Sequence, residues 1–435
     1  MGEKKREIIT GRAFYFMPSP FCALKITIEE RYNHERMENA ICELEKVHPI
    51  ISNGVVQEEN RLWFREIGKH VRLHRYSEET VDWKAVYQTE VSEALDLRME
   101  SGVKIAVLEH SDCFDLILLF HHIYADGISA KYLLSDLLTI YGTGQKMDVR
   151  EPLSEIGIER LCEKVTVSQE TVRKTEHTLQ TWEQNRMVFG FDSFKQMNEL
   201  HHKLARYELT VGGLEKSEFL KLRKRCKEHG VTVNSALATA ILAGIQAEEA
   251  VNTLIPVNAR PVLELENDTG LANLASSVNL KLCYESGSDF WTNVAGIHEK
   301  MYKARTDTAG SMERLYTFMR FNEDIFGAGY YAQYGMYKKQ DMLETLREVL
   351  LPDMQRKTLD FSNIGAMPYE IKEGNIRVRE CYVIPNFTPT CDWMFAVVSL
   401  ADALTFSFVY SSRRISGNAA EEIMNRIRFC LCENL

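Results

Sequence analysis

His121-His-Ile-Tyr-Ala-Asp-Gly127 is the most informative stretch of this sequence. It directly follows residues 113–120, whose second half is apolar on both faces, as is typical of a central strand of a sheet. It directly precedes residues 128–141, whose apolar side chains recur at helical spacing, with Asp126 or Ser129 as the candidate N-cap. The stretch therefore lies on a connection between a buried strand and a helix, where side chains can face a cleft.

The residue types in this connection suit acid–base chemistry. A histidine has an ordinary pKa of about 6.5 and can take a proton from a hydroxyl or amine that attacks a carbonyl. Asp126 can orient the ring or hold the loop through an arginine, and Gly127 lets the backbone turn sharply or approach a substrate closely. The alternative interpretation is a pair of histidines packed at a strand end. A metal site is not expected, because adjacent strand residues such as His121 and His122 point to opposite faces.

The composition is that of an ordinary globular protein. Of the 435 residues, 45% are hydrophobic and 26% are charged, and the length fits two or three domains or two halves of one larger fold. The 24 glycines and 10 prolines are too few for a fibrous or disordered chain. The net charge of −10 argues against nucleic acid as a partner, although a local basic pocket for an anionic co-substrate is compatible with it.

Several features indicate a cytoplasmic protein. Residues 1–6, Met-Gly-Glu-Lys-Lys-Arg, do not begin an apolar signal-peptide core. The longest apolar runs, such as residues 116–120 and 236–245, are far shorter than the roughly 18 residues that a membrane span requires. The ten cysteines follow no metal-binding spacing and are expected to be mostly buried, reduced thiols. We therefore expect no membrane span and a cytoplasmic location.

Outward from the motif, strand and helix patterns are mixed along the whole chain. In the first half they predict a helix over 33–47 and strands over 12–17, 50–56, 61–67 and 103–109. In the second half they predict helices over 214–229, 232–246, 289–307, 309–326 and 418–432, and strands over 204–210, 253–257, 276–284, 358–364, 376–384, 392–400 and 404–410. This mixture predicts an α/β or α+β layer architecture. The polar stretch 148–198 marks the boundary, which divides the chain into residues 1–185 and 186–435.

Residues 121–127 resemble the active-site signature of the chloramphenicol acetyltransferase-like superfamily. That superfamily includes condensation domains of nonribosomal peptide synthetases, polyketide-associated acyltransferases and alcohol acetyltransferases. Weaker similarities occur in the same order as in that superfamily, and they are Leu44-Glu-Lys-Val-His-Pro49, Ala94-Leu-Asp-Leu97 before Val103, Gly230-Val-Thr-Val-Asn234, Ile255-Pro-Val-Asn-Ala-Arg-Pro261 and Ser362-Asn-Ile-Gly365. Together they cover most of the chain.

The resemblance implies a pseudo-dimer of two similar halves with a tunnel between them. His122 would project into this tunnel as the general base, with His121 and Gly127 in supporting roles. Asp126 would turn away from the substrate and form a salt bridge, for which Arg260 is the candidate partner, with a surface arginine before a turn proline as the alternative. Ser362 or Asn363 are candidates for stabilising the oxyanion or lining the tunnel, unless they only shape a turn.

The same resemblance implies transfer of an acyl group from a thioester to a hydroxyl or amine of a small-molecule acceptor. The donor would be acyl-CoA, and a covalent acyl-enzyme is not needed. No permanently bound cofactor is expected. Ser52 stands near the place where condensation domains often carry an arginine, and Gly270-Leu-Ala-Asn273 departs from the form common in relatives. These departures favour a discrete acyltransferase over a synthetase module. The alternatives are a free-standing condensation-type enzyme that uses an acyl carrier protein as partner, and a non-catalytic member that binds a carrier or ligand.

Three further patterns are secondary candidates. A basic run over residues 221–227 could meet a carrier protein or the phosphates of coenzyme A, although a solvated helix face explains it as well. The aromatic stretch 327–335 is a candidate tunnel lining, with ordinary packing as the alternative. His201 and His202 have no aspartate four residues on, and we interpret them as a surface pair.

Overall fold

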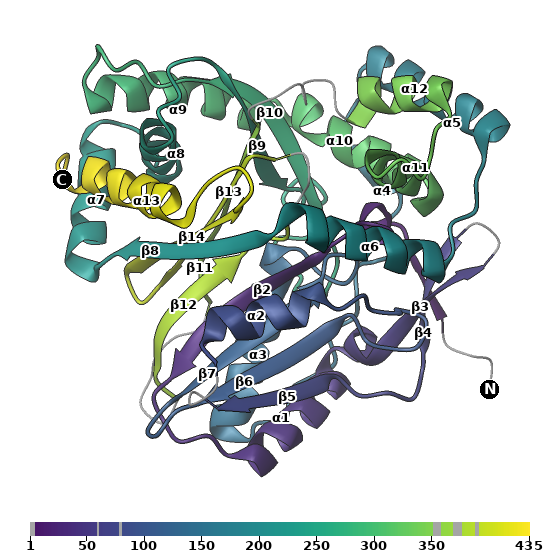
Figure 1. The fold of residues 1–435 in the computed structure, drawn as a ribbon, viewed down its shortest axis with the longest axis horizontal. Helices are drawn as coiled ribbons and strands as arrows, with labels where there is room; N and C mark the ends of the chain where they lie inside the picture. The colour runs from purple at the N-terminus through teal and green to yellow at the C-terminus, as the bar shows by residue number, and fades with distance from the viewer. Residues whose placement is uncertain (1–4, 59–60, 78–80, 351–357, 369–375, 388–390) are drawn as a thin grey trace.

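The computed structural model describes residues 5–58, 61–77, 81–350, 358–368, 376–387 and 391–435. They form two large sheets with helices packed on them, and a third group of helices lies beside a small sheet (Figure 1). The mixed α/β architecture that the sequence predicts is therefore confirmed. Each large sheet has its own buried apolar core, so the chain folds as two layered halves.

The first large sheet carries the histidine motif. Its strands, in spatial order, are β12 (Val378–Ile384), β2 (Phe21–Ile28), β7 (Phe114–His121), β6 (Val103–Glu109) and β5 (Arg72–Ser77). Every residue of β2 and β7 is buried, as expected for central strands. The helices of this half are α1 (His34–Val47), α2 (Trp83–Ser92) and α3 (Gly127–Thr143). Helix α1 begins where the Asn33 side chain accepts a hydrogen bond from the Arg36 amide, and it packs against α3.

The second large sheet forms the other half. Its strands, in spatial order, are β10 (Ala275–Leu282), β9 (Val251–Asn258), β11 (Thr358–Ala366), β13 (Trp393–Leu400), β14 (Ala403–Ser411) and β8 (Tyr207–Leu214). Its helical layer consists of α7 (Lys216–Glu228), α8 (Val233–Gly244), α9 (Phe290–Thr306) and α13 (Gly417–Cys432) (Figure 1). Gly230 follows α7 with a φ of +67°, and this left-handed conformation ends the helix.

A third group of elements lies to one side of both sheets in Figure 1. Its small sheet has the order β1 (Lys5–Ile8), β4 (Arg61–Glu66) and β3 (Asn53–Glu58). Its helices are α4 (Ile158–Lys164), α5 (Gln169–Asn185), α6 (Phe191–Ala205), α10 (Thr308–Arg320), α11 (Glu323–Gln333) and α12 (Gln340–Leu350). Helices α10 and α11 hold one wall of the cavity described below.

Several expected boundaries are wrong. Residues 12–14 form a 3-10 turn rather than a strand, because Gly11 at a φ of +85° starts a tight turn there. Residues 49–52 are also a 3-10 turn before β3. The helix expected over 309–326 is broken by Phe321, and Asn322 caps a new helix through its side chain. Strand β5 was not expected, because its residues are only half-buried at a sheet edge.

The second half contributes one strand to the first sheet. Strand β12 lies in the C-terminal part of the chain but pairs antiparallel with β2 in the first sheet. A cut at residue 185, the boundary expected from the sequence, would separate β12 from that sheet. Pairing of β12 with β2 therefore joins the C-terminal part of the chain to the first sheet.

Candidate active site

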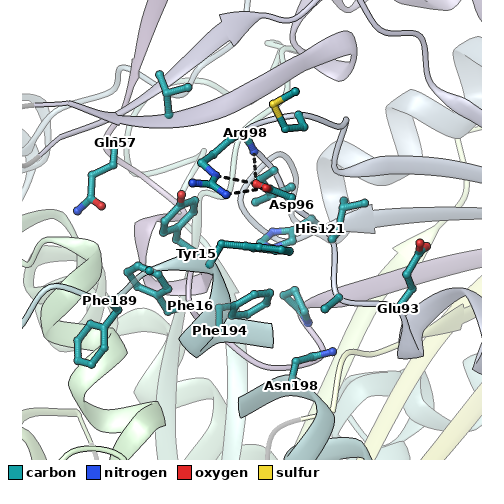
Figure 2. Close-up of a pocket in the computed structure, with 18 of the residues that line it drawn as sticks. Tyr15, Phe16, Gln57, Glu93, Asp96, Arg98, His121, Phe189, Phe194 and Asn198 are labelled. Atoms are coloured by element: carbon teal, nitrogen blue, oxygen red, sulfur yellow. Dashed lines mark hydrogen bonds and ion pairs between the residues drawn. The ribbon is translucent and has the colours of Figure 1, made fainter. Parts of the chain in front are cut away.

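The connection from β7 to α3 sends its two histidines to opposite sides. His121 is the last residue of β7, is 2% exposed, and accepts a hydrogen bond at Nδ1 from the Ile123 amide over 3.1 Å. It lines a separate pocket of about 630 Å³ together with Tyr15 and Asn198 (Figure 2). Burial, and then the nearby charge of His122, lower the pKa of His121 to about 3, so its ring stays neutral.

His122 faces the cavity between the two halves, and its hydrogen bonds define its tautomer. Nδ1 lies 3.0 Å from the carbonyl oxygen of Ala125, which can only accept, so Nδ1 carries the proton. The Asn273 side-chain amide donates to the His122 carbonyl oxygen over 2.9 Å and fixes the backbone of the loop. The unprotonated Nε2 therefore points into the cavity, where the Cys22 sulfur lies 3.0 Å away.

The protein around His122 keeps the ring neutral near pH 7. Burial lowers the pKa of His122, whereas the hydrogen bond to Ala125, the charge of Asp126 and the Asn386 side chain oppose part of this effect. Phe14 packs on the ring, with 4.6 Å between ring centroids. His122 is half-buried and lines the cavity. A neutral imidazole with a free Nε2 can accept a proton from a bound group.

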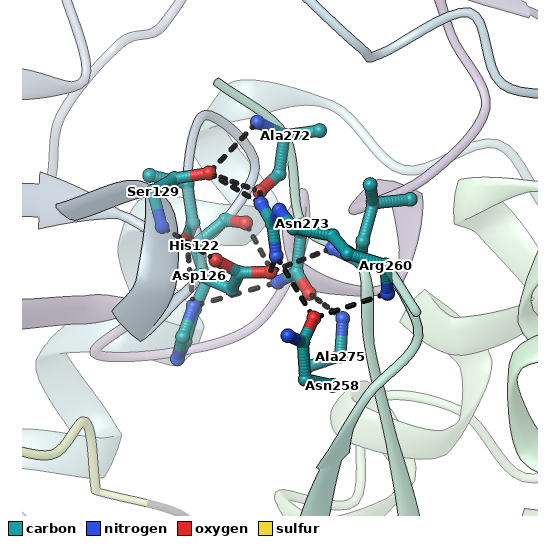
Figure 3. A network of polar contacts seen from close by, with 10 residues as sticks. His122, Asp126, Ser129, Asn258, Arg260, Ala272, Asn273 and Ala275 are labelled. Atoms are coloured by element: carbon teal, nitrogen blue, oxygen red, sulfur yellow. Dashed lines mark hydrogen bonds and ion pairs between the residues drawn. The ribbon is translucent and has the colours of Figure 1, made fainter. Parts of the chain in front are cut away.

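Asp126 and Arg260 form a buried ion pair across the two halves (Figure 3). The Arg260 Nη1 donates to Asp126 Oδ2 over 2.7 Å, and the two residues are 1% and 3% exposed. Burial alone would raise the pKa of Asp126, but the Arg260 charge and its hydrogen bond, followed by bonds from the Ser129 and Leu274 amides, hold that pKa below its ordinary value. The carboxylate also caps α3 through Ser129, as the sequence suggested.

The same network attaches the motif to residues 272–274 of the other half. Ser129 Oγ accepts from Arg260 Nη2 over 2.8 Å and donates to the Ala272 carbonyl oxygen over 2.9 Å. The Asp126 amide donates to the same carbonyl over 3.1 Å. The Leu274 amide donates to Asp126 Oδ2 over 2.9 Å. The position of His122 therefore depends on backbone that lies more than 140 residues away in the sequence.

Gly127 is needed for a close approach rather than for a left-handed turn. A Cβ atom at this position would lie 2.5 Å from Cγ2 of Ile364 on β11. The Lys131 ammonium, one turn further along α3, donates to the carbonyl oxygens of Ile364 and Ala366. Helix α3 of the first half thus packs directly on β11 of the second.

The cavity in front of His122 has a volume of about 270 Å³ and is lined by both halves. Alternate residues of β11, Asp360, Ser362 and Ile364, face it. Asn363 points to the other side, where its amide donates to the Asn234 side chain over 3.2 Å and it lines a different pocket. Asn363 therefore does not face this cavity, since side chains along a strand alternate, whereas Ser362 lines it.

Two ionisable side chains also line the cavity. Burial raises the pKa of Asp360 to about 7, although the charge of Arg314 opposes this shift. Arg314 comes from α10 and stacks its guanidinium on Phe318, 4.8 Å from the ring centroid. The remaining walls are largely apolar, which suits an acyl chain or another apolar substrate group.

The secondary candidates have mixed outcomes. Gly329, Tyr330 and Gln333 of the aromatic stretch do line the cavity. The basic run lies on α7 in the outer helical layer, where Arg223 pairs with Asp402. The expectation of a surface histidine pair is wrong. His201 is 1% exposed, its Nδ1 lies 2.6 Å from the Tyr334 hydroxyl, and the Tyr207 hydroxyl lies 3.1 Å from the same nitrogen.

Two features bear on cofactors and membranes. Among the residues that the structure describes, no group of three His, Cys, Asp or Glu side chains is placed to hold a metal ion. Within the same residues, no helix is long and apolar enough to cross a bilayer.

Comparison with solved structures gives the fold class. The chain is similar to the epimerization domain from the third module of tyrocidine synthetase B, with a TM-score of 0.66, 14% identity and coverage of 100% of this chain and 97% of that one. It is also similar to a trichothecene 15-O-acetyltransferase from Fusarium sporotrichioides, with a TM-score of 0.64, 12% identity and coverage of 99% and 95%. A third similar structure is polyketide synthase associated protein 5 from Mycobacterium tuberculosis, with a TM-score of 0.61, 13% identity and coverage of 98% of this chain and 96% of that one. The fold is thus that of condensation domains and related acyltransferases.

The family follows from the sequence match. Residues 14–271, more than half of the 435, match the family described as Condensation domain, so the chain belongs to that family. The resemblance recognised in the sequence is confirmed. No curated protein matches the chain.

Proposed function

We propose that this protein transfers an acyl group from a thioester to a hydroxyl or amine of a small-molecule acceptor, with His122 as the general base. The observation that carries the proposal is the orientation of the His122 ring. Its Nδ1 donates to the Ala125 carbonyl oxygen, so Nε2 is unprotonated and can accept a proton inside a cavity that both halves line.

The chemistry divides among three side chains. Nε2 of His122 takes the proton from the attacking group and later returns it to the departing thiolate. Ser362 Oγ, which lines the same cavity, is the candidate donor to the oxyanion of the tetrahedral intermediate. Asp126 acts as a positioning residue, because its carboxylate is occupied by Arg260 and by backbone amides rather than by the imidazole.

The donor is proposed to be acyl-CoA. A specific observation supports an acyl carrier protein as the alternative donor, since the chain matches the Condensation domain family and a structural relative is part of a peptide synthetase. A thioester of N-acetylcysteamine mimics the end of the phosphopantetheine arm that both donors share. It therefore tests the chemistry first, and coenzyme A and carrier-protein thioesters then distinguish the two donors.

The experiment follows free thiol released from acetyl, octanoyl and palmitoyl thioesters of N-acetylcysteamine and of coenzyme A, with a panel of alcohols and amines. We expect acceptor-dependent release by the wild-type protein and a loss of at least about 100-fold in His122→Ala. His177→Ala is the matched control, because His177 is an exposed histidine on α5. Equal release by wild type and His122→Ala would overturn the proposal, and wild-type release no faster than in the absence of protein would favour the non-catalytic alternative.

A further inference from the structure

Cys22 occupies the place in front of the base. It lies on β2 directly opposite Phe120 of β7, so its side chain enters the cavity next to His122. The sulfur is 3.0 Å from Nε2 of His122, so the thiol can donate to the proposed base, and Asn386 Oδ1 is a second, more distant acceptor at 3.6 Å. A nucleophile and a base within hydrogen-bonding distance in one cavity are the arrangement that nucleophilic catalysis requires.

A second contact fixes the sulfur. The backbone amide of Asn386, in the segment after β12, lies 3.2 Å from Cys22 Sγ and donates to it. The Asn386 side-chain amide is held in turn by Met17 Sδ at 3.6 Å. An N–H group directed at a sulfur stabilises negative charge that develops there when the proton leaves.

The surroundings explain why Cys22 needs a base. Burial raises the pKa of Cys22 to about 12, and only the Asn386 amide lowers it in part. The resting residue is therefore a thiol, which is a weak nucleophile. Removal of its proton by Nε2 in the same step as attack avoids the free thiolate.

We propose that Cys22 is the first acceptor of the acyl group, so that the enzyme transfers the group in two steps through an S-acyl cysteine. In the first step the Cys22 S–H proton passes to His122 Nε2, the sulfur bonds to the thioester carbonyl carbon, and the bond from that carbon to the donor sulfur breaks. The donor thiolate takes the proton from Nε2. The products are a free donor thiol and an S-acyl Cys22.

The second step returns the protein to its starting state. The acceptor gives its proton to Nε2 and attacks the acyl carbon, the bond to Cys22 breaks, and the proton returns to the Cys22 sulfur. Each step exchanges one acyl bond for another and requires no oxidant or reductant. The inference rests on the proposed function, and it replaces the direct transfer expected from the sequence with two transfers at one base.

The test uses the full chain with octanoyl-N-acetylcysteamine and octanoyl-CoA, and with the acetyl and palmitoyl analogues, in the absence of acceptor. Samples are quenched over time and analysed by intact and peptide mass spectrometry. We expect one acyl group per chain on Cys22, labile to hydroxylamine. His122→Ala should slow adduct formation at least about 100-fold. Cys22→Ala should abolish the adduct, and Cys226→Ala, a buried cysteine on α7, is the matched control that should retain it.

Steady-state kinetics separate this inference from the proposed function. Parallel lines in double-reciprocal plots against donor and acceptor are expected, with loss of turnover in Cys22→Ala. Turnover by the wild type without an adduct, together with turnover by Cys22→Ala at the wild-type kcat/KM, would overturn the role of Cys22 while leaving His122 as the base. Absence of both adduct and turnover with every donor would overturn the proposed function itself.

Discussion

Removing the carboxylate of Asp126 tests whether the motif is held by the other half. In Asp126→Ala the Arg260 guanidinium, 1% exposed, loses the partner at 2.7 Å and keeps the Asn258 side chain at 3.3 Å, Ser129 and the Ala272 carbonyl oxygen. Breaking a buried ion pair on one side costs about 3–5 kcal/mol, because the remaining charge stays desolvated. The lost N-cap of α3, worth about 1 kcal/mol, is part of the same change.

The expected shift in Tm follows from the size of the chain. With an unfolding entropy of about 2.1 cal/mol/K per residue, the 435 residues give about 0.9 kcal/mol/K. A loss of about 3–5 kcal/mol therefore lowers Tm by about 3–5 °C, which calorimetry measures. Urea unfolding measures the loss in the free energy of unfolding itself. Glu183→Ala is the control, because the Glu183–Arg186 pair is exposed, and its effect should stay within about 0.5 kcal/mol.

A double variant distinguishes an unpaired charge from a general loss of packing. Asp126→Ala combined with Arg260→Met removes both charges, so it should be more stable than Asp126→Ala alone. If Asp126→Ala costs less than 1 kcal/mol, like the exposed control, the ion pair does not hold the two halves together. If the double variant is no more stable than Asp126→Ala, the loss of stability in Asp126→Ala does not come from an unpaired Arg260.

Two further predictions concern stability. Gly127→Ala should cost about 1–3 kcal/mol in urea unfolding, because its Cβ would meet Ile364 Cγ2 at 2.5 Å, and adding Ile364→Ala should recover part of the loss if that contact is the cause. Burial, and then the charge of Asp324, raise the pKa of Glu323 to about 7. Between about pH 5 and pH 8 the folded protein therefore binds a proton that the unfolded chain has released, and the free energy of unfolding falls as the pH rises through this range. The free energy of unfolding of Glu323→Gln, relative to that of the wild type, should rise by up to about 3 kcal/mol over this pH range. If the difference in stability between the two proteins is the same at pH 5 and pH 8, the raised pKa of Glu323 is contradicted.

The sequence predicts the site where local pattern determines local structure. The apolar run before His121 and the helical spacing after Asp126 were enough to place the motif on a strand–helix connection. The alternation of side chains along the strand correctly separated His121 from His122. The same rule, applied to the predicted strand 358–364, would already have excluded one of Ser362 and Asn363 from the cavity.

The remaining site residues could not be predicted, because they are brought in by pairing across the fold. Cys22 belongs to an apolar strand and carries no motif, and only the register of β2 against β7 places it beside His122. Asn273 lies in a segment that departs from the family pattern, yet its side chain holds the His122 carbonyl oxygen. No local signal indicates that either residue is near the histidine, since 100 and 151 residues separate them from it.

The motif is therefore not an independent catalytic unit. Its aspartate is bound by Arg260, its backbone by residues 272–274, and its glycine lies against β11, all from the second half. Strand β12, also from the second half, extends the sheet that carries the motif, and the segment after it supplies the Asn386 amide to the Cys22 sulfur. A change at any of these contacts can displace Nε2 of His122 without altering residues 121–127. An intact signature is thus necessary for the proposed chemistry but not sufficient, because the base is positioned only when the two halves pack together.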